Sequence, residues 1–320
     1  MKLTRGRPSQ DGVRVLYIGG WGRSGSTLLD RILGRAPGFV AVGELRDLFL
    51  RGPVEDRLCG CGCPFSTCPF WQEVGRIAFG GWDRADAGRL ASLRSTLDRP
   101  WNLLHLLRPD LSTAYADRHR EYLNAVTAVY RAVHDVTDGA TIVDSSKIPS
   151  YALLLRGIPG SELRVVHLRR DSRGVVFSWR KHVMKVDRPD APEAMHRYGV
   201  VPAALRYDAY NAMTECLRLT RVPVLPLRYE DLVRRPAASL ARVIEFAGGD
   251  ASAASTVASG PEIVLEPGHG LDGNPMRFTH GIMALREDDE WRRSMPSRDR
   301  RVVTALTSPM LSRYGYGLRG

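Results

Sequence analysis

The chain has 320 residues, enough for one large hydrophobic core or two modest ones, and its 43% hydrophobic and 25% charged content is typical of a globular enzyme. Its net charge of +11 (46 basic against 35 acidic side chains) fits an anionic ligand or nucleic acid without choosing between them. No uninterrupted apolar stretch reaches about 18 residues, so we expect no membrane-spanning helix. Residues 1–14 lack the apolar segment of a secretory signal, so we expect a cytoplasmic protein.

Short apolar runs typical of buried strands alternate along the chain with longer segments of helical period. The expected strands cover residues 13–18, 39–42, 141–143, 163–168 and 222–227. A long insertion, residues 51–139, separates the second and third strands, and a second insertion, 189–219, also has a helical pattern. The expected helices of the first insertion cover residues 71–79, 84–97 and 112–136. We predict a single α/β domain over residues 1–320, with a P-loop-type parallel sheet flanked by helices and a helical cap over the active site.

A glycine-rich segment, residues 19–29, joins the first expected strand to an amphipathic helix. Backbone N–H groups at such a turn, together with the positive end of the helix dipole, form an anion cradle. The glycine spacing matches a Walker A loop, but Ser26 stands where that loop carries its lysine. Arg23, three residues before Ser26, would supply a cation from a different position than the Walker A lysine. The segment therefore predicts a phosphate-type site without the lysine that grips β- and γ-phosphates.

Three functions are compatible with this loop alone. The loop also satisfies G-x-G-x-x-G, and Glu44 follows the second strand as the acidic residue of a dinucleotide-binding fold would, so an NAD-type Rossmann oxidoreductase is one alternative. A P-loop kinase or NTPase is the second, and Asp144 at the end of the third strand would be its metal-binding acid. A metal-independent phosphate or sulfate transferase is the third. A nucleic-acid-binding module is not expected, because the cations of interest sit at strand ends, apart from the aromatic residues of the insertion.

A second candidate anion site follows the fourth expected strand, in residues 169–178. Asp171 or Ser172 would cap the helix that begins there, which places Arg170 at the helix mouth. Ser178 lies about two turns further along, on the same face as Asp171. An arginine fork with a hydroxyl donor suits a dianionic phosphate. Two anion sites on neighbouring strands predict a ligand with phosphate groups at two ends, which a dehydrogenase would not need at this place.

Residues 22–29, Gly-Arg-Ser-Gly-Ser-Thr-Leu-Leu, resemble the 5′-phosphosulfate loop of the sulfotransferase family. Arg170 and Ser178 are similar to the family's 3′-phosphate site, and Tyr229 in Tyr-Glu-Asp-Leu to a tyrosine of its cofactor site. Residues 268–278 lie where such enzymes close a loop over the nucleotide, but they lack the Arg-Lys-Gly signature of the cytosolic members. The resemblance implies 3′-phosphoadenosine 5′-phosphosulfate (PAPS) as donor and 3′-phosphoadenosine 5′-phosphate (PAP) as product. It implies these cofactor-binding residues: Arg23, Ser24, Gly25, Ser26, Thr27, Arg170, Ser178, Tyr229, Asn274 and Arg277.

The same resemblance implies how the reaction would proceed. Glu44 resembles the glutamate base of the tyrosylprotein and glycan sulfotransferases, and Lys147 the lysine that some members place near the leaving oxygen. With Arg23, these residues would transfer the sulfonyl group by in-line displacement to a hydroxyl or amine of a small-molecule, lipid-linked or glycan acceptor, as in secondary metabolism. A sulfonyl group carries less charge than a phosphoryl group, so we expect no Mg²⁺ requirement. The sequence does not choose among the acceptors and leaves the oligomeric state open.

Four of the five cysteines fall within ten residues, at Cys59, Cys61, Cys63 and Cys68. In a reducing compartment such clustering points to a metal site before disulfides. The C-x-C-x-C-x4-C spacing is not that of a standard zinc finger or ribbon, and no second Cys/His pair lies nearby in sequence. The sequence therefore leaves zinc binding, disulfides and free thiols open, and we assign no metal ligand.

Overall fold

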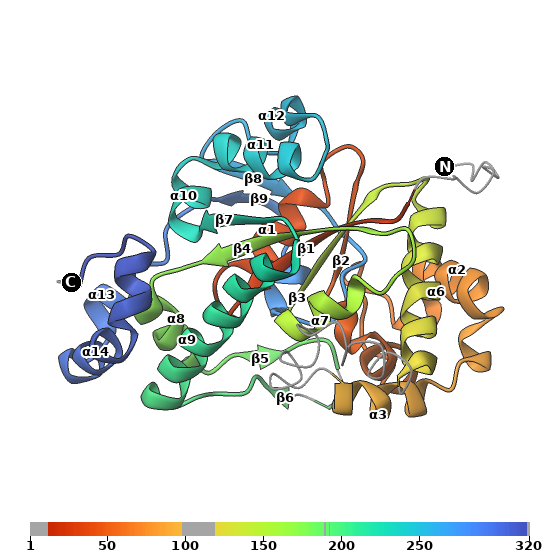
Figure 1. Cartoon of the computed structure of the whole chain (residues 1–320), viewed down its shortest axis with the longest axis horizontal. Coiled ribbons are helices and arrows are strands. Elements are labelled where there is room, and N and C mark those ends of the chain that lie inside the picture. Colours follow the sequence, from red (N-terminus) through yellow and green to blue (C-terminus); the bar gives the residue numbers. More distant parts are fainter. Residues whose placement is uncertain (1–11, 98–118, 189, 192, 319–320) are drawn as a thin grey trace.

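The computed structural model describes residues 12–97, 119–188, 190–191 and 193–318, and in these residues five parallel strands form the main sheet in the order β2-β3-β1-β4-β7 (Figure 1). The strands are β1 (Arg14–Gly20), β2 (Phe39–Gly43), β3 (Thr141–Lys147), β4 (Glu162–Arg169) and β7 (Val224–Arg228). Each corresponds to a strand expected from the sequence. The predicted α/β class with a parallel sheet is confirmed.

Strand β1 is the middle of the sheet and pairs with β3 on one side and β4 on the other. Residues 15–20 are all buried because both faces of the strand are covered. Val15 and Tyr17 belong to one hydrophobic cluster, whereas Leu16 and Ile18 belong to another, as the alternation of side chains along a strand requires. Burial on both faces explains why the strands are continuous apolar runs in the sequence.

Helices cover both faces of the sheet. On the Leu16 face lie α1 (Ser26–Leu33), α10 (Tyr229–Arg234), α11 (Pro236–Phe246) and α12 (Ala254–Val257). On the Tyr17 face lie α6 (Arg120–Val136), α7 (Pro149–Leu155) and α9 (Val200–Cys216). Helix α8 (Ser172–Arg180) packs on α9, beside α13 (Trp291–Ser294) and α14 (Ser297–Arg313) at one end of the molecule (Figure 1, left).

The first insertion forms a helical group at the other end of the sheet (Figure 1, right). It contains α2 (Pro69–Phe79), α3 (Ala87–Leu97) and α6, and α2 and α3 both pack on α6. The first two match the helices expected at 71–79 and 84–97. Helix α6 matches the later part of the helix expected at 112–136, whose first residues, 112–118, lie outside the described residues.

The second insertion is helical in its later part, as expected, because α9 covers Val200–Cys216, but its first part differs. A two-stranded ribbon of β5 (Met184–Lys185) and β6 (Glu193–Ala194) precedes α9, where a helical pattern was expected from residue 189 onward; positions 189 and 192 lie outside the described residues. Each ribbon strand has only two residues, too few to show an alternating pattern. Within the described part of the chain, no helix has both the length and the apolar character needed to cross a membrane.

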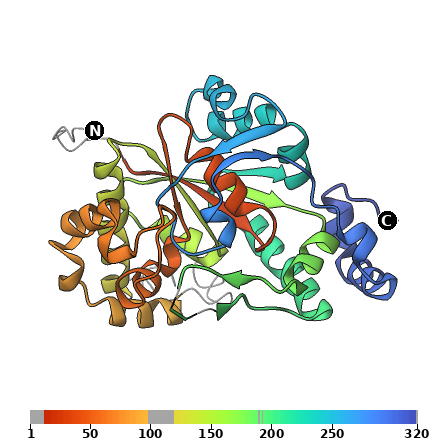
Figure 2. The same cartoon turned by 180° about the vertical axis from the view of Figure 1, so that it is seen from behind.

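The C-terminal segment, residues 262–288, returns across the sheet beside α1 (Figure 2). It contains the hairpin of β8 (Glu262–Leu265) and β9 (Gly281–Ala284). The buried side chain of Arg31 in α1 donates hydrogen bonds to the carbonyls of Glu266 (2.7 Å), Met276 (2.8 Å) and Thr279 (2.5 Å). The Arg31 guanidinium therefore fastens the C-terminal segment at three points to α1, the helix that follows the glycine loop.

Candidate active site

A cavity of about 550 Å³ is lined by residues at or just beyond the carboxyl end of every strand of the parallel sheet. Ligands bind at this edge in open α/β sheets, and the volume is in the range of about 300–1,000 Å³ typical of ligand pockets. The cavity brings together most of the predicted site residues: Arg23, Gly25, Ser26, Thr27, Glu44, Lys147, Arg170, Ser178, Tyr229 and Asn274. Ser24 and Arg277 are not among its described lining residues.

The glycine loop after β1 packs closely against neighbouring rings. Gly25 has a φ of 92°, and a Cβ there would lie 2.6 Å from the ring of Tyr229, so the position requires glycine. Arg23 has a φ of 69°, a strained value for a residue with a side chain. Within the described residues no side chain caps α1, so the N–H groups of its first turn have no intrahelical partner. These groups are placed as the predicted anion cradle requires, and anion binding there stays a prediction.

Three polar atoms around this loop are buried without a hydrogen-bond partner in the described part of the chain: Trp21 Nε1, Arg23 Nε and Ser24 Oγ. The Arg23 guanidinium lies 5.1 Å from the centre of the Trp179 ring, and its burial lowers the pKa of Arg23 against the opposing charge of Glu44. Buried polar atoms are normally hydrogen-bonded. Trp21 and Arg23 line the cavity, so a bound anionic ligand would be placed to supply partners for these two side chains.

Glu44 and Lys147 form an ion pair in the cavity, with 2.5 Å between Glu44 Oε1 and Lys147 Nζ. Lys147 Nζ also donates to the carbonyl of Ser145 at 2.8 Å, and the backbone of Lys147 has a strained φ of 69°. Burial raises the pKa of Glu44, and the charge of Lys147 counteracts part of that rise. A carboxylate of raised pKa is suited to take up a proton, and the adjacent ammonium can stabilise negative charge.

Arg170 connects the second anion site to the glycine loop. It is 6% exposed, and its guanidinium donates to the carbonyl of Arg23 (3.0 Å) and to Asp288 Oδ2 (3.0 Å). The ring of Tyr229 lies 4.6 Å away. Burial tends to raise the pKa of Asp288, but the charge and hydrogen bond of Arg170, together with the charge of Lys181, hold that pKa below its usual range. Asp288 thus holds the guanidinium for which the sequence predicts a phosphate partner.

Helix α8 places Arg170 and Ser178 as the sequence predicts. Asp171 is its N-cap and accepts a hydrogen bond from Arg173 N at 2.9 Å. Arg170 immediately precedes this cap, and Ser178 lies about two turns along the helix; both line the cavity. Both side chains therefore open into the same cavity.

Several lining residues were missed by the sequence reasoning. Trp21, Trp179, Tyr198 and Tyr210 form an aromatic wall in which neighbouring ring centres are 4.5–5.9 Å apart. Other missed lining residues include Arg46, Lys185, Met195 and Asp288. They come from segments without a recognisable motif, and only tertiary packing brings them to the cavity.

Two further residues have structural partners. Arg277 donates to the carbonyl of Leu58 (3.0 Å) and to Asp187 Oδ2 (3.1 Å), and it lines a neighbouring cavity of about 300 Å³. Its predicted contact with the donor stays a prediction. Asn274 does line the reaction cavity, and its Oδ1 also accepts a hydrogen bond from Met276 N at 3.0 Å, which caps a short helix.

Asp144, the acid that an NTPase would use for metal binding, is fully buried. The hydroxyls of Tyr130 and Ser146 donate to its carboxylate, as does Ser146 N at 2.7 Å. Asp144 is absent from the described residues that line the cavity. Its geometry therefore indicates a structural role, holding the turn that leads to Lys147, and it argues against the kinase or NTPase alternative.

The family model described as "Sulfotransferase family" matches residues 78–252, more than half of the chain. Among solved structures, the chain is similar to the sulfotransferase domain of the olefin synthase of Synechococcus PCC 7002 (20% identity, 97% of this chain and 98% of that chain, TM-score 0.48). It is also similar to the sulfotransferase domain of the curacin biosynthetic pathway (16% identity, 97% and 99%, TM-score 0.47) and to sulfotransferase STF9 of Mycobacterium avium (13%, 96% and 78%, TM-score 0.46). No curated protein matches it. On the extent of the family match, the chain belongs to the sulfotransferase family.

Proposed function

We propose that this protein transfers the sulfonyl group of PAPS to a hydroxyl or amine of an acceptor and releases PAP. One observation carries the proposal: a carboxylate–ammonium pair opens into the same cavity as a glycine-loop anion cradle and a second, arginine-based anion site. Membership of the sulfotransferase family supports sulfonyl transfer as the reaction. PAPS as the donor, the class of acceptor and the role of each residue are proposed in addition to that family membership.

The cavity residues fit the two charged ends of the donor. The first-turn N–H groups of α1, with Ser26 and Thr27, would hold the 5′-phosphosulfate, and Arg23 Nε would gain the partner that it lacks. Arg170 and Ser178 would hold the 3′-phosphate. This second contact requires the Arg170 guanidinium to exchange Asp288 for phosphate, since the two anions compete for it.

In the proposed reaction, Glu44 takes the proton of the acceptor hydroxyl as its oxygen attacks sulfur. A new S–O bond forms while the bond from sulfur to the bridging phosphate oxygen breaks on the opposite side. Lys147 and Arg23 stabilise the negative charge that develops on that bridging oxygen. The proton remains on Glu44, which burial makes a stronger base than an exposed glutamate. No Mg²⁺ is required, since these cations supply the stabilising charge.

The acceptor side of the cavity is partly apolar. The aromatic wall of Trp21, Trp179, Tyr198 and Tyr210 offers a flat surface for the body of an acceptor or for a ring of the donor. A small molecule, a lipid-linked sugar and a glycan are all compatible with it. We propose a cytoplasmic enzyme that does not act on nucleic acid.

Calorimetric titration with PAP in Mg²⁺-free buffer tests the donor site directly. We expect micromolar or tighter binding that Arg170→Ala largely abolishes. Quenching of the fluorescence of Trp21 and Trp179 would provide an independent signal, because both rings line the cavity. Failure to bind PAP, with binding of NADH or of ATP·Mg²⁺ in its place, would refute the proposal.

A further inference from the structure

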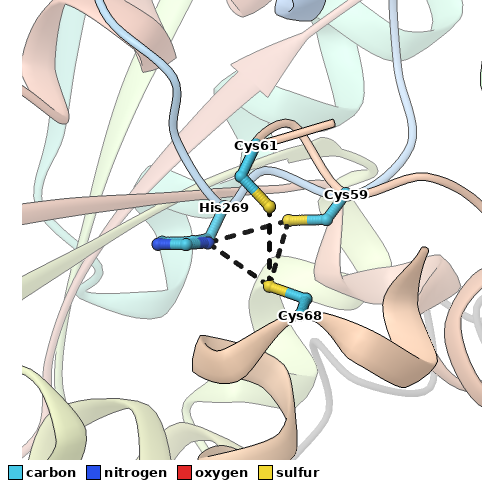
Figure 3. Close-up of side chains that lie close together, drawn as sticks. All are labelled: Cys59, Cys61, Cys68 and His269. Atoms are coloured by element: carbon cyan, nitrogen blue, oxygen red, sulfur yellow. Dashed lines mark hydrogen bonds between the residues drawn. The ribbon is translucent and has the colours of Figure 1, made fainter. Parts of the chain in front are cut away.

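The loop that carries the clustered cysteines, residues 59–68, lies against a histidine from a distant part of the chain. The Sγ atoms of Cys59, Cys61 and Cys68 and the Nδ1 atom of His269 all lie within 4.8 Å of one another (Figure 3). His269 belongs to the C-terminal segment, 201 residues after Cys68. The fold therefore brings a fourth possible metal ligand to the three cysteines, one that lies too far along the chain to be found by looking for nearby Cys/His pairs.

Four of the six distances between these ligand atoms match those around a tetrahedral metal ion, and the other two are within 4.8 Å. The Sγ atom of Cys68 lies 3.6 Å from that of Cys59 and 3.7 Å from that of Cys61. His269 Nδ1 lies 3.5 Å from Cys68 Sγ and 3.8 Å from Cys59 Sγ. A tetrahedral zinc ion with Zn–S bonds of about 2.3 Å and a Zn–N bond of about 2.0 Å separates its ligands by about 3.5–3.8 Å.

The surroundings hold the four side chains in place. Cys59 and Cys68 are fully buried, and Cys68 is the residue immediately before α2, where the helix dipole stabilises a thiolate. The His269 ring stacks on that of Phe70, with 4.6 Å between ring centres and an angle of 8° between planes. The His269 carbonyl accepts a hydrogen bond from Trp71 Nε1 at 3.0 Å. These contacts orient the ring so that Nδ1 points toward the sulfur atoms (Figure 3).

We propose that Cys59, Cys61, Cys68 and His269 bind one structural Zn²⁺ ion. Binding forms three S–Zn bonds and one N–Zn bond, and the three thiol protons pass to solvent. Four protein ligands complete the tetrahedron and leave no position for a substrate. The described residues that line the reaction cavity include none of the four. The ion is thus a structural element outside the reacting site.

This ion would fasten the C-terminal segment to the first insertion beside the proposed base. Leu271, two residues after His269, accepts a hydrogen bond from Glu44 N (2.8 Å) and donates one to the carbonyl of Val42 (3.0 Å). A Cβ on Gly273 would lie 2.8 Å from Glu44 Oε1, so the segment packs directly on the base. The zinc site would therefore limit the movement of the segment that covers Glu44.

The first test is the metal content of tag-free protein purified under reducing conditions from zinc-supplemented medium. We expect about one zinc per chain in the native protein, and most of it lost in Cys61→Ser and in His269→Ala. Cys63→Ser is the matched control: Cys63 lies in the same loop but outside the cluster, so this variant should retain its zinc. Equal loss in the control and in Cys61→Ser would overturn the assignment.

A second test does not depend on the folding of the variants. Native protein stripped of metal and reloaded with Co²⁺ should show the intense visible bands of a tetrahedral thiolate site, and Zn²⁺ should displace them. Metal should also protect three of the clustered thiols from a thiol reagent. The proposal fails if the native protein takes up neither metal, or if its intact mass shows a disulfide between these cysteines.

Discussion

Replacing Glu44 with glutamine tests the central assignment of the site. The glutamine side chain would keep the size and most of the packing of the glutamate, but it could not take up the acceptor's proton. Lys147 would keep its hydrogen bond to the carbonyl of Ser145 (2.8 Å), so the ammonium would stay in the cavity. The change therefore removes the proposed base while leaving the proposed anion-binding groups, Arg170 included, in place.

The size of the effect follows from the role. Loss of a general base costs about 10²- to 10⁴-fold in rate, which at about 1.36 kcal/mol per factor of ten corresponds to about 2.7–5.4 kcal/mol of transition-state stabilisation. PAP binding should be unchanged or slightly tighter, because removal of a negative charge leaves Arg23 and Lys147 less neutralised. Burial raises the pKa of Glu44, so the acid limb of kcat/KM in the native enzyme should lie above the usual glutamate pKa of about 4.3. That limb should disappear in the variant.

The assay is conversion of PAPS to PAP with a saturating acceptor, followed across pH, together with calorimetric titration of PAP. Glu121→Gln is the control, because Glu121 also forms an ion pair (2.7 Å to Arg89) but lies on the surface. The control should keep its turnover within about twofold. Glu44 is not the base if Glu44→Gln retains turnover within about tenfold of the native enzyme, or if it loses PAP binding to the same extent as turnover.

Three further changes have defined expectations. Arg170→Ala should weaken PAP binding by about 2–5 kcal/mol in calorimetry, because the 3′-phosphate loses its buried cation. Asp288→Asn should tighten the same binding about two- to fivefold, because a half-exposed competitor for that guanidinium is removed; weaker binding would argue against competition. Burial raises the pKa of Asp30 to about 8, against about 3.9 when unfolded, so between these values the folded state binds more protons and stability falls as pH rises. The melting temperature of Asp30→Asn, measured relative to that of the native protein, should therefore rise between about pH 5 and about pH 8. A difference between the two melting temperatures that does not change with pH would contradict this expectation.

The fold was largely predictable because its main signals are local. Parallel strands buried on both faces are continuous apolar runs, and most predicted site segments directly follow such a run. Asn274 and Arg277 are the exception, because they lie beyond the antiparallel strand β8. Glu44, Lys147 and Arg170 meet because the carboxyl ends of parallel strands lie at one edge of the sheet. Knowledge of strand direction was therefore sufficient to bring them together.

The rest of the site depends on packing between distant segments. His269 and Asp288 carry no local pattern that links them to Cys68 or to Arg170, and both reach their partners through the path of the C-terminal segment. The aromatic wall is similarly assembled from the glycine loop, α8 and the second insertion. A single sequence contains these residues but gives no distance between them.

The Glu44–Lys147 ion pair also bears on the order in which two substrates would bind. In the pair, Lys147 occupies Oε1 of the proposed base, and Glu44 neutralises the cation proposed to stabilise the leaving oxygen. A donor that attracts Lys147 toward its phosphosulfate frees the carboxylate in the same movement. Steady-state kinetics should then follow a compulsory order, with the donor binding first and the nucleotide product leaving last. PAP would consequently inhibit competitively against the donor and noncompetitively against the acceptor.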